Sequence, residues 1–164
     1  MSSSALHQTV PAAPPRKLRA WIPTLLWLCV LAAFSTDMFS AEHTGGILLK
    51  IVHALFGRIS AHQFLKIHFF VRKSAHFCSY GLLSALAFFS WRATLPSFRH
   101  WTLRWSLLAV LLAATAGGLD EFHQRFVPSR GSSLHDVFVD TIGAVFFQLA
   151  IALWLLRKPD RTAE

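Results

Sequence analysis

Apolar residues of this chain are concentrated in four long runs, which are separated by shorter segments rich in basic, acidic or proline residues. The runs cover about residues 21–41, 74–91, 101–119 and 137–156. An α-helix rises ~1.5 Å per residue and needs ~20 residues to cross a hydrocarbon layer of ~30 Å. Tryptophans lie at or near the ends of the runs, as in the aromatic belts of membrane proteins. The pattern predicts an all-α membrane protein with four transmembrane helices.

The stretch 47–71, between the first and second runs, has a different pattern. Basic residues recur in it at intervals of three to five among Leu, Ile and Phe, at Lys50, His53, Arg58, His62 and Lys66. This spacing places the basic groups on one face of a helix. It predicts one amphipathic helix that lies in the headgroup plane of the membrane. A fifth span is the alternative, but the repeated charges make it costly.

Both ends of the chain are predicted to be tails. Residues 1–20 are rich in Ser and Pro and end in basic residues, which is typical of a disordered arm, and residues 157–164 form a short C-terminal tail. A cleaved signal peptide is the competing interpretation of the first apolar run, but no small-x-small cleavage site ends that run. Four spans put both tails and the 92–104 connection on one side of the membrane. That side carries nine Lys and Arg, and the other side carries seven. This excess favours cytoplasmic termini in a bacterial inner membrane.

Composition supports a membrane protein and argues against nucleic-acid binding. Hydrophobic residues make up 54% of the chain and charged residues 15%, against ~25% charged in soluble domains. The net charge is +8, but the basic residues mostly flank apolar runs, and no nucleic-acid-binding motif is present. Cys29 and Cys78 lie within apolar runs and form no CxxC pair, so they are interpreted as packing residues.

Polar residues gather where the second predicted span begins, the third ends and the fourth begins. In a four-span chain these three points lie at the same membrane surface. Four of the eight carboxylates fall within 21 residues there, at Asp120, Glu121, Asp136 and Asp140. Polar side chains near the apolar layer are costly unless they are paired or hydrated. Their clustering therefore predicts a functional site at this surface.

Helical spacing refines the predicted site. Lys73, His76 and Tyr80 are spaced i, i+3, i+7 and share one stripe of a helix. Asp136 and Asp140 are one turn apart, so they repel each other unless a cation or a proton intervenes. The candidate binding residues are Lys73, His76, Tyr80, Asp120, Glu121, His123, Gln124, Arg130, Asp136 and Asp140.

Purely structural interpretations stand beside the functional one. Lys73 suits a plain anchor at the membrane interface. Ser133-x-x-Asp136 before an apolar run resembles a helix capping box, with Ser133 as the N-cap. The carboxylates that follow the third span have Arg125 and Arg130 as salt-bridge partners. Asp140, one turn into the fourth span, is explained equally by a neutral, hydrogen-bonded group.

Two blocks of the chain resemble the VanZ-like family. RKSAHF at 72–77 followed by YGLL at 80–83 resembles its first signature, and DEFHQRFVPSR at 120–130 followed by Asp136 and Gly143 resembles its second. Asp140 stands where the family pattern usually has Asn, and Ser129 where Gly is common. The resemblance implies a small bacterial integral membrane protein. The family's namesake is associated with resistance to the glycopeptide antibiotic teicoplanin, and no biochemical activity is settled for the family.

Three functions are consistent with these residues. The first is binding of an anionic or lipid-linked envelope component, or of a glycopeptide antibiotic, in a charged pocket at the outer membrane surface. The second is a hydrolase or transferase acting on a lipid-linked substrate, with acid–base chemistry and a possible divalent metal assigned to His76, Asp120, Glu121 and His123. No HExxH motif or nucleophile motif supports it. The third is a transport or assembly role, which Asp140 and Gln148 within the fourth run suggest.

Overall fold

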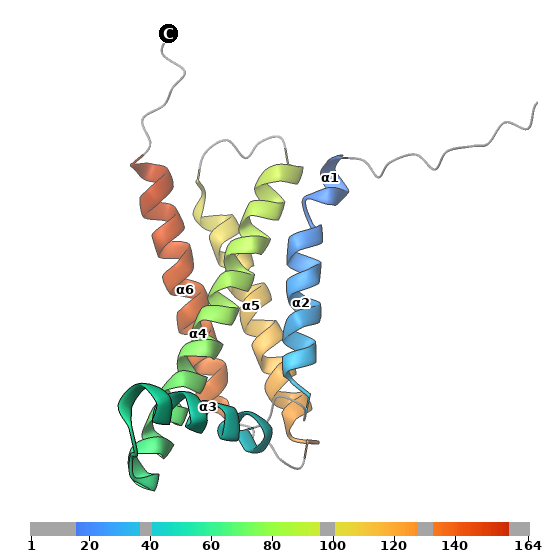
Figure 1. The fold of residues 1–164 in the computed structure, drawn as a ribbon. Helices are drawn as coiled ribbons and strands as arrows, with labels where there is room; N and C mark the ends of the chain where they lie inside the picture. The colour runs from blue at the N-terminus through green and yellow to red at the C-terminus, as the bar shows by residue number, and fades with distance from the viewer. Residues whose placement is uncertain (1–15, 37–40, 96–100, 128–132, 158–164) are drawn as a thin grey trace, which may run out of the picture.

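The computed structural model describes residues 16–36, 41–95, 101–127 and 133–157, and all regular structure within these ranges is helical. The helices are α1 (Arg16–Arg19), α2 (Ile22–Phe34), α3 (Ala41–Phe56), α4 (Ala61–Thr94), α5 (Leu103–Gln124) and α6 (Leu134–Leu156). In Figure 1, α2, α4, α5 and α6 run lengthwise in one bundle, and α3 lies across one end of it. The short α1 and the C-terminal end of α6 lie at the opposite end, so the described chain begins and finishes on the same side.

Two of the four predicted spans are long and apolar enough to cross a membrane. These are α5, with 22 residues, and α6, with 23. Helix α2 has only 13 residues, or about 20 Å of helix, because Ser35 ends it well before position 41. Helix α4 runs for 34 residues and includes the predicted span 74–91, but its N-terminal part carries the basic residues of the 47–71 stretch.

The single amphipathic helix expected over 47–71 is divided between two helices. Gly57 has a φ of +74°, a left-handed conformation that glycine adopts without strain, and α3 ends just before it. Ser60 then caps α4, since its side chain accepts from the backbone N–H of Gln63 while the Gln63 side chain accepts from the backbone N–H of Ser60. Residues 61–71 therefore belong to the same continuous helix as the second predicted span.

Apolar and polar residues are distributed as expected in a lipid environment. Large apolar side chains are exposed on the outer faces of the helices, including Leu111 on α5 and Phe146 and Leu153 on α6. Asp140 and Gln148 instead lie buried within the bundle. A soluble helical bundle would bury the apolar stripe and expose the polar one. This distribution, together with α5 and α6, supports the membrane interpretation.

Small residues let α4, α5 and α6 approach closely. A Cβ added to Gly143 of α6 would collide with the backbone carbonyl of Phe77 on α4. A Cβ added to Gly117 of α5 would lie 3.0 Å from Oδ2 of Asp140. Close approach at small residues is typical of helices packed in membranes. It places the start of α6 directly between α4 and α5, where the predicted site residues lie.

Matched polar pairs tie the bundle together away from that region. Gln148 Nε2 on α6 donates to Oγ of Ser84 on α4 at 2.8 Å and to the Ser84 carbonyl at 3.0 Å. The hydroxyls of Thr24 on α2 and Ser90 on α4 lie 2.8 Å apart. Such bonds between transmembrane helices contribute ~0.6 kcal/mol on average. They account for most of the buried polar groups in the middle and the far end of the bundle.

Candidate functional site

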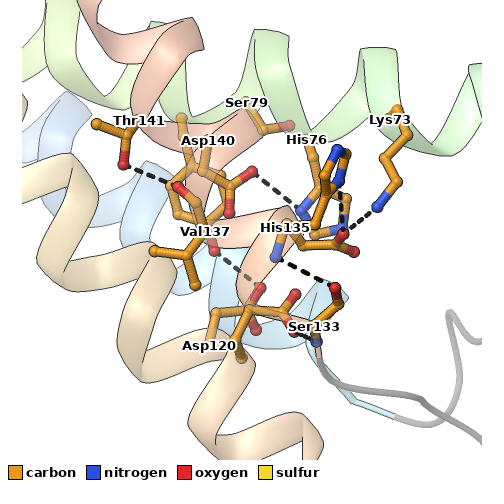
Figure 2. Close-up of polar contacts among 12 residues, drawn as sticks. Lys73, His76, Ser79, Asp120, Ser133, His135, Val137, Asp140 and Thr141 are labelled. Carbon is orange, nitrogen blue, oxygen red and sulfur yellow. Dashed lines mark hydrogen bonds and ion pairs between the residues drawn. The ribbon is translucent and has the colours of Figure 1, made fainter.

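The first layer of the site is an ion pair between α4 and α6. Lys73 Nζ bonds to Oδ1 of Asp136, and Figure 2 shows Lys73 reaching from α4 toward the start of α6. Asp136 is buried in the first turn of α6, where the helix dipole favours a negative charge. The exposed ring of His135 also lies near it, with Nδ1 3.8 Å from Oδ1 of Asp136. Lys73 thus has a partner within the protein.

The second layer lies one helical turn deeper. His76 Nδ1 is 3.2 Å from Oδ1 of Asp140, which again joins α4 to α6 (Figure 2). Asp140 is completely buried, with 0% of its surface exposed. Its second oxygen, Oδ2, has no hydrogen-bond partner among the described residues. The hydrogen bond fixes the orientation of the imidazole ring and leaves one carboxylate oxygen unsatisfied.

The third layer joins α4 to α5. Tyr80 Oη donates to Oδ2 of Asp120 at 2.8 Å, and Gln124 Nε2 donates to the same oxygen at 3.0 Å. The other carboxylate oxygen, Oδ1 of Asp120, is buried and has no partner within the described ranges. The rings of His76 and Tyr80 stack with centroids 6.1 Å apart. The stripe on α4 therefore contacts three different carboxylates in succession, as its i, i+3, i+7 spacing allows.

Glu121 and Ser133 fasten the start of α6 to the end of α5. Ser133 is the N-cap of α6, since its hydroxyl accepts from the backbone N–H of His135 at 3.2 Å. The Ser133 backbone N–H donates to Oε2 of Glu121 at 2.8 Å. In a capping box this N–H would donate to the side chain of Asp136, so Glu121 replaces Asp136 as the acceptor. Glu121 is 4% exposed, and its Oε1 has no partner in the described part of the chain.

His123, near the end of α5, has its hydrogen-bond partner at the end of α2. Its Nδ1 lies 2.9 Å from Oγ of Ser35, at the C-terminal end of α2, and the ring is exposed. Gln124 bonds to Asp120 on one face of α5, whereas the hydrogen-bond partner of His123 is at the end of α2. Ser35 is a site residue that sequence reasoning missed, because it lies inside the first apolar run and belongs to no polar cluster in the sequence.

The structure brings together most of the predicted site residues. The members that converge where α4, α5 and α6 meet are Lys73, His76, Tyr80, Asp120, Glu121, Gln124, Asp136 and Asp140. His123 lies at the edge, on the α2 side. Arg130 falls in residues 128–132, outside the described residues, so its predicted role is not tested.

No metal centre is formed by the described side chains. Within the described ranges, no three His, Cys, Asp or Glu side chains are grouped closely enough to hold a metal ion. The proposed ligands have other partners, since His76 bonds to Asp140 and His123 to Ser35. The divalent metal suggested by the sequence stays a prediction.

Acceptors outnumber donors at this end of the bundle. Four buried oxygens have no hydrogen-bond partner among the described residues: Asp120 Oδ1, Glu121 Oε1, Gln124 Oε1 and Asp140 Oδ2. An unsatisfied buried acceptor costs about 1–3 kcal/mol, and more when it is charged. A cavity of about 80 Å³ is lined by one of these residues, Asp120, together with His76 and Tyr80. At ~30 Å³ per water, this space holds two or so water molecules.

The fold and the site together define a small all-helical protein, with two helices long and apolar enough to span a membrane and a carboxylate-rich polar cluster at one end of its bundle. The family model VanZ/LLP1 matches residues 20–156, and the chain belongs to this family. The matched range covers both signature blocks and every predicted site residue. No curated protein and no solved structure matches the chain.

Proposed function

We propose that the chain binds the polar head of a lipid or lipid-linked envelope component in this cluster, at the outer surface of the bacterial inner membrane. The outward placement rests on the excess of basic residues on the side of the two tails, which includes the 92–104 connection. The beginning of α1 and the end of α6 lie opposite the cluster (Figure 1), so cytoplasmic tails would direct the cluster outward.

Four buried acceptor oxygens that have no partner among the described residues carry this proposal. A fold does not retain several buried, unsatisfied acceptors without a donor to complete them, because each lowers stability. Sugar hydroxyls, amines and amides are suitable donors, and envelope lipids carry them in numbers. A glycopeptide antibiotic carries the same groups, so it is a further ligand to titrate.

An anionic head is the less suitable ligand. Lys73, the basic side chain among the converging binding residues, is already paired with Asp136. Asp120 lines the cavity, and a phosphate close to its carboxylate would meet a like charge, which disfavours the ionised form of both groups. A neutral, hydroxyl-rich head avoids this repulsion.

Titration of the full-length protein in phosphatidylcholine nanodiscs with a fluorescent glycosyl diacylglycerol tests the proposal. Asp120→Asn is the decisive variant, because its amide oxygen still accepts from Tyr80 and Gln124 while an NH₂ replaces the free Oδ1. We expect this variant to weaken binding at least about tenfold, since a hydrogen bond to a charged group contributes ~1.5–3 kcal/mol.

Arg104→Gln is the matched control, because Arg104 is exposed at the other end of the same helix. It should leave binding unchanged. Tighter binding of phosphatidic acid than of the glycolipid, or equal affinity of Asp120→Asn and the unmodified protein, would contradict the donor-rich ligand.

The hydrolase or transferase alternative has one observation in its favour. Asp140 holds His76 by a hydrogen bond beside a cavity, and an oriented imidazole is what a general base requires. This alternative predicts turnover of the glycolipid to products separable by chromatography. A His76→Gln variant that binds but no longer turns over would support it, and intact glycolipid after prolonged incubation would count against it.

A further inference from the structure

A groove that shares Tyr80 and Asp120 with the smaller cavity extends between α2 and α5. Helix α2 packs along α4, where Trp27 Nε1 donates to the Ser79 carbonyl at 2.9 Å, and its C-terminal Ser35 bonds to His123 of α5. This leaves a space of about 380 Å³ between α2 and α5. Its apolar walls are formed by Leu28, Leu31, Ala32, Ala116 and Leu119. The volume lies within the ~300–1,000 Å³ typical of ligand pockets.

The groove has one polar end, and that end belongs to the candidate site. Ser35, Asp120 and His123 line it there, with Tyr80 shared between the groove and the smaller cavity. Thr36 adds a further hydroxyl beside Ser35, the remaining lining is apolar, and Ala32 and Leu119 are exposed. In a bilayer these exposed walls face the hydrocarbon layer, so the groove opens sideways to lipid.

We propose that this groove binds a single hydrocarbon chain, whose hydroxyl- or amine-bearing head lies at Asp120. The inference rests on the proposed function in taking the ligand to be a lipid, and it adds where the chain lies and which head chemistry is accepted.

The size of the groove selects a thin occupant. A helix is ~10 Å across, so about 380 Å³ would accommodate only about 5 Å of its length, or one turn. A neighbouring helix therefore cannot be inserted into this space, whereas an extended hydrocarbon chain can follow it. A chain that enters from the bilayer also loses no hydration, and it fills the contacts that an empty apolar groove forfeits.

The charge at the polar end selects the head. Asp120 already accepts two hydrogen bonds at Oδ2, whereas its Oδ1 is buried without a partner in the described residues. A hydroxyl or an amine attached near the end of the chain completes that oxygen. A carboxylate in the same place would face Asp120 with like charge. A monoacylglycerol is therefore a suitable probe, and a fatty acid of the same chain is its matched counterpart.

Photo-crosslinking of the full-length protein in nanodiscs tests the inference. The probes are palmitoyl glycerol and palmitic acid, each with a diazirine in the middle of the chain, and the labelled peptides are mapped by mass spectrometry. We expect labelling by the glycerol ester to concentrate on residues 28–32 and 116–119. The fatty acid should label these residues at least about fivefold less, because of the like charges at Asp120.

Two adjacent alanines of α2 provide matched variants. Ala32 lines the groove, whereas Ala33 is exposed but is not part of its lining. Because both positions are exposed, a tryptophan at either one overpacks no buried position. Ala32→Trp should reduce groove labelling at least about tenfold, and Ala33→Trp should leave it within about twofold.

Labelling spread evenly over the lipid-facing surface, or lost equally in both tryptophan variants, would overturn the inference. Equal labelling by the two probes would overturn the head preference. The proposed function can fail separately from the groove. If the groove is still labelled but Asp120→Asn has no effect in the glycolipid titration, the groove binds a chain and the proposed headgroup site is wrong.

Discussion

Replacement of Lys73 by methionine separates a structural role for this side chain from a ligand-binding role. Methionine keeps the length and much of the packing of lysine but removes the charge, so Asp136 is left without its ion-pair partner. Breaking a fully buried pair costs about 3–5 kcal/mol, whereas exposed pairs contribute ~0–1 kcal/mol. The Asp136 side chain is 5% exposed and the Lys73 side chain 18%, so water reaches the pair from one side only. We expect a loss of about 2 kcal/mol.

The double variant Lys73→Met/Asp136→Leu supplies the internal control. It removes both charges, so position 136 no longer holds a carboxylate without its ion-pair partner. We expect it to be at least about 1 kcal/mol more stable than Lys73→Met alone, although it loses the favourable interaction of Asp136 with the N-terminus of α6. Two charges that act independently would instead give additive losses.

Thermal unfolding in detergent, followed by the fluorescence of the six tryptophans, measures these differences. On the scale of ~2–4 °C per kcal/mol for domains of this size, Lys73→Met should unfold about 4–8 °C below the unmodified protein. An unchanged unfolding temperature, accompanied by weaker binding of phosphatidic acid, would refute the reasoning. Lys73 would then be a ligand contact that stabilises nothing in the free protein.

Three further predictions follow from the packing. Gly143→Ala should lower stability by about 1–3 kcal/mol, because its Cβ collides with the Phe77 backbone, whereas Gly118→Ala, which has open space, should be neutral or stabilising by up to ~1 kcal/mol; thermal unfolding compares the two. Gln148→Leu should cost about 1 kcal/mol, since the bonds to Ser84 are lost, and should leave glycolipid affinity unchanged. Asp140→Asn should keep or raise the unfolding temperature, because a buried amide costs less than a buried carboxylate, and a marked fall would show that the charge pairs with His76.

The convergence of the polar cluster could be predicted from spacing alone. A stripe at i, i+3, i+7 must lie along one face of a helix, and each of its members on α4 contacts a carboxylate of α5 or α6. The individual pairings could not be predicted, because they depend on how far α6 slides along α4. Gly143 restricts that register, because any side chain at this position would collide with the Phe77 backbone of α4.

The parts of the fold that sequence reasoning missed depend on single residues with little pattern around them. Gly57 and the capping pair of Ser60 and Gln63 interrupt an otherwise continuous amphipathic spacing, and a periodicity argument averages over such a break. Likewise, Ser35 is one hydroxyl at the end of an apolar run, and only the position of α2 beside α5 brings it to His123. Local caps and long-range contacts therefore set the limits of the prediction.

The balance of donors and acceptors distinguishes the two ends of the bundle. Away from the site, polar groups are mostly matched, as in the Thr24–Ser90 pair and the two donations from Gln148, whose own oxygen is the exception there. At the site, three carboxylates and Gln124 each leave a buried oxygen unsatisfied by the described residues. A bundle that needed these groups only for packing would be more stable with apolar side chains in their place. Since the cost falls where a groove of apolar walls meets the cluster, a ligand with a hydrocarbon chain and a hydrogen-bond-donating head accounts for both features at once.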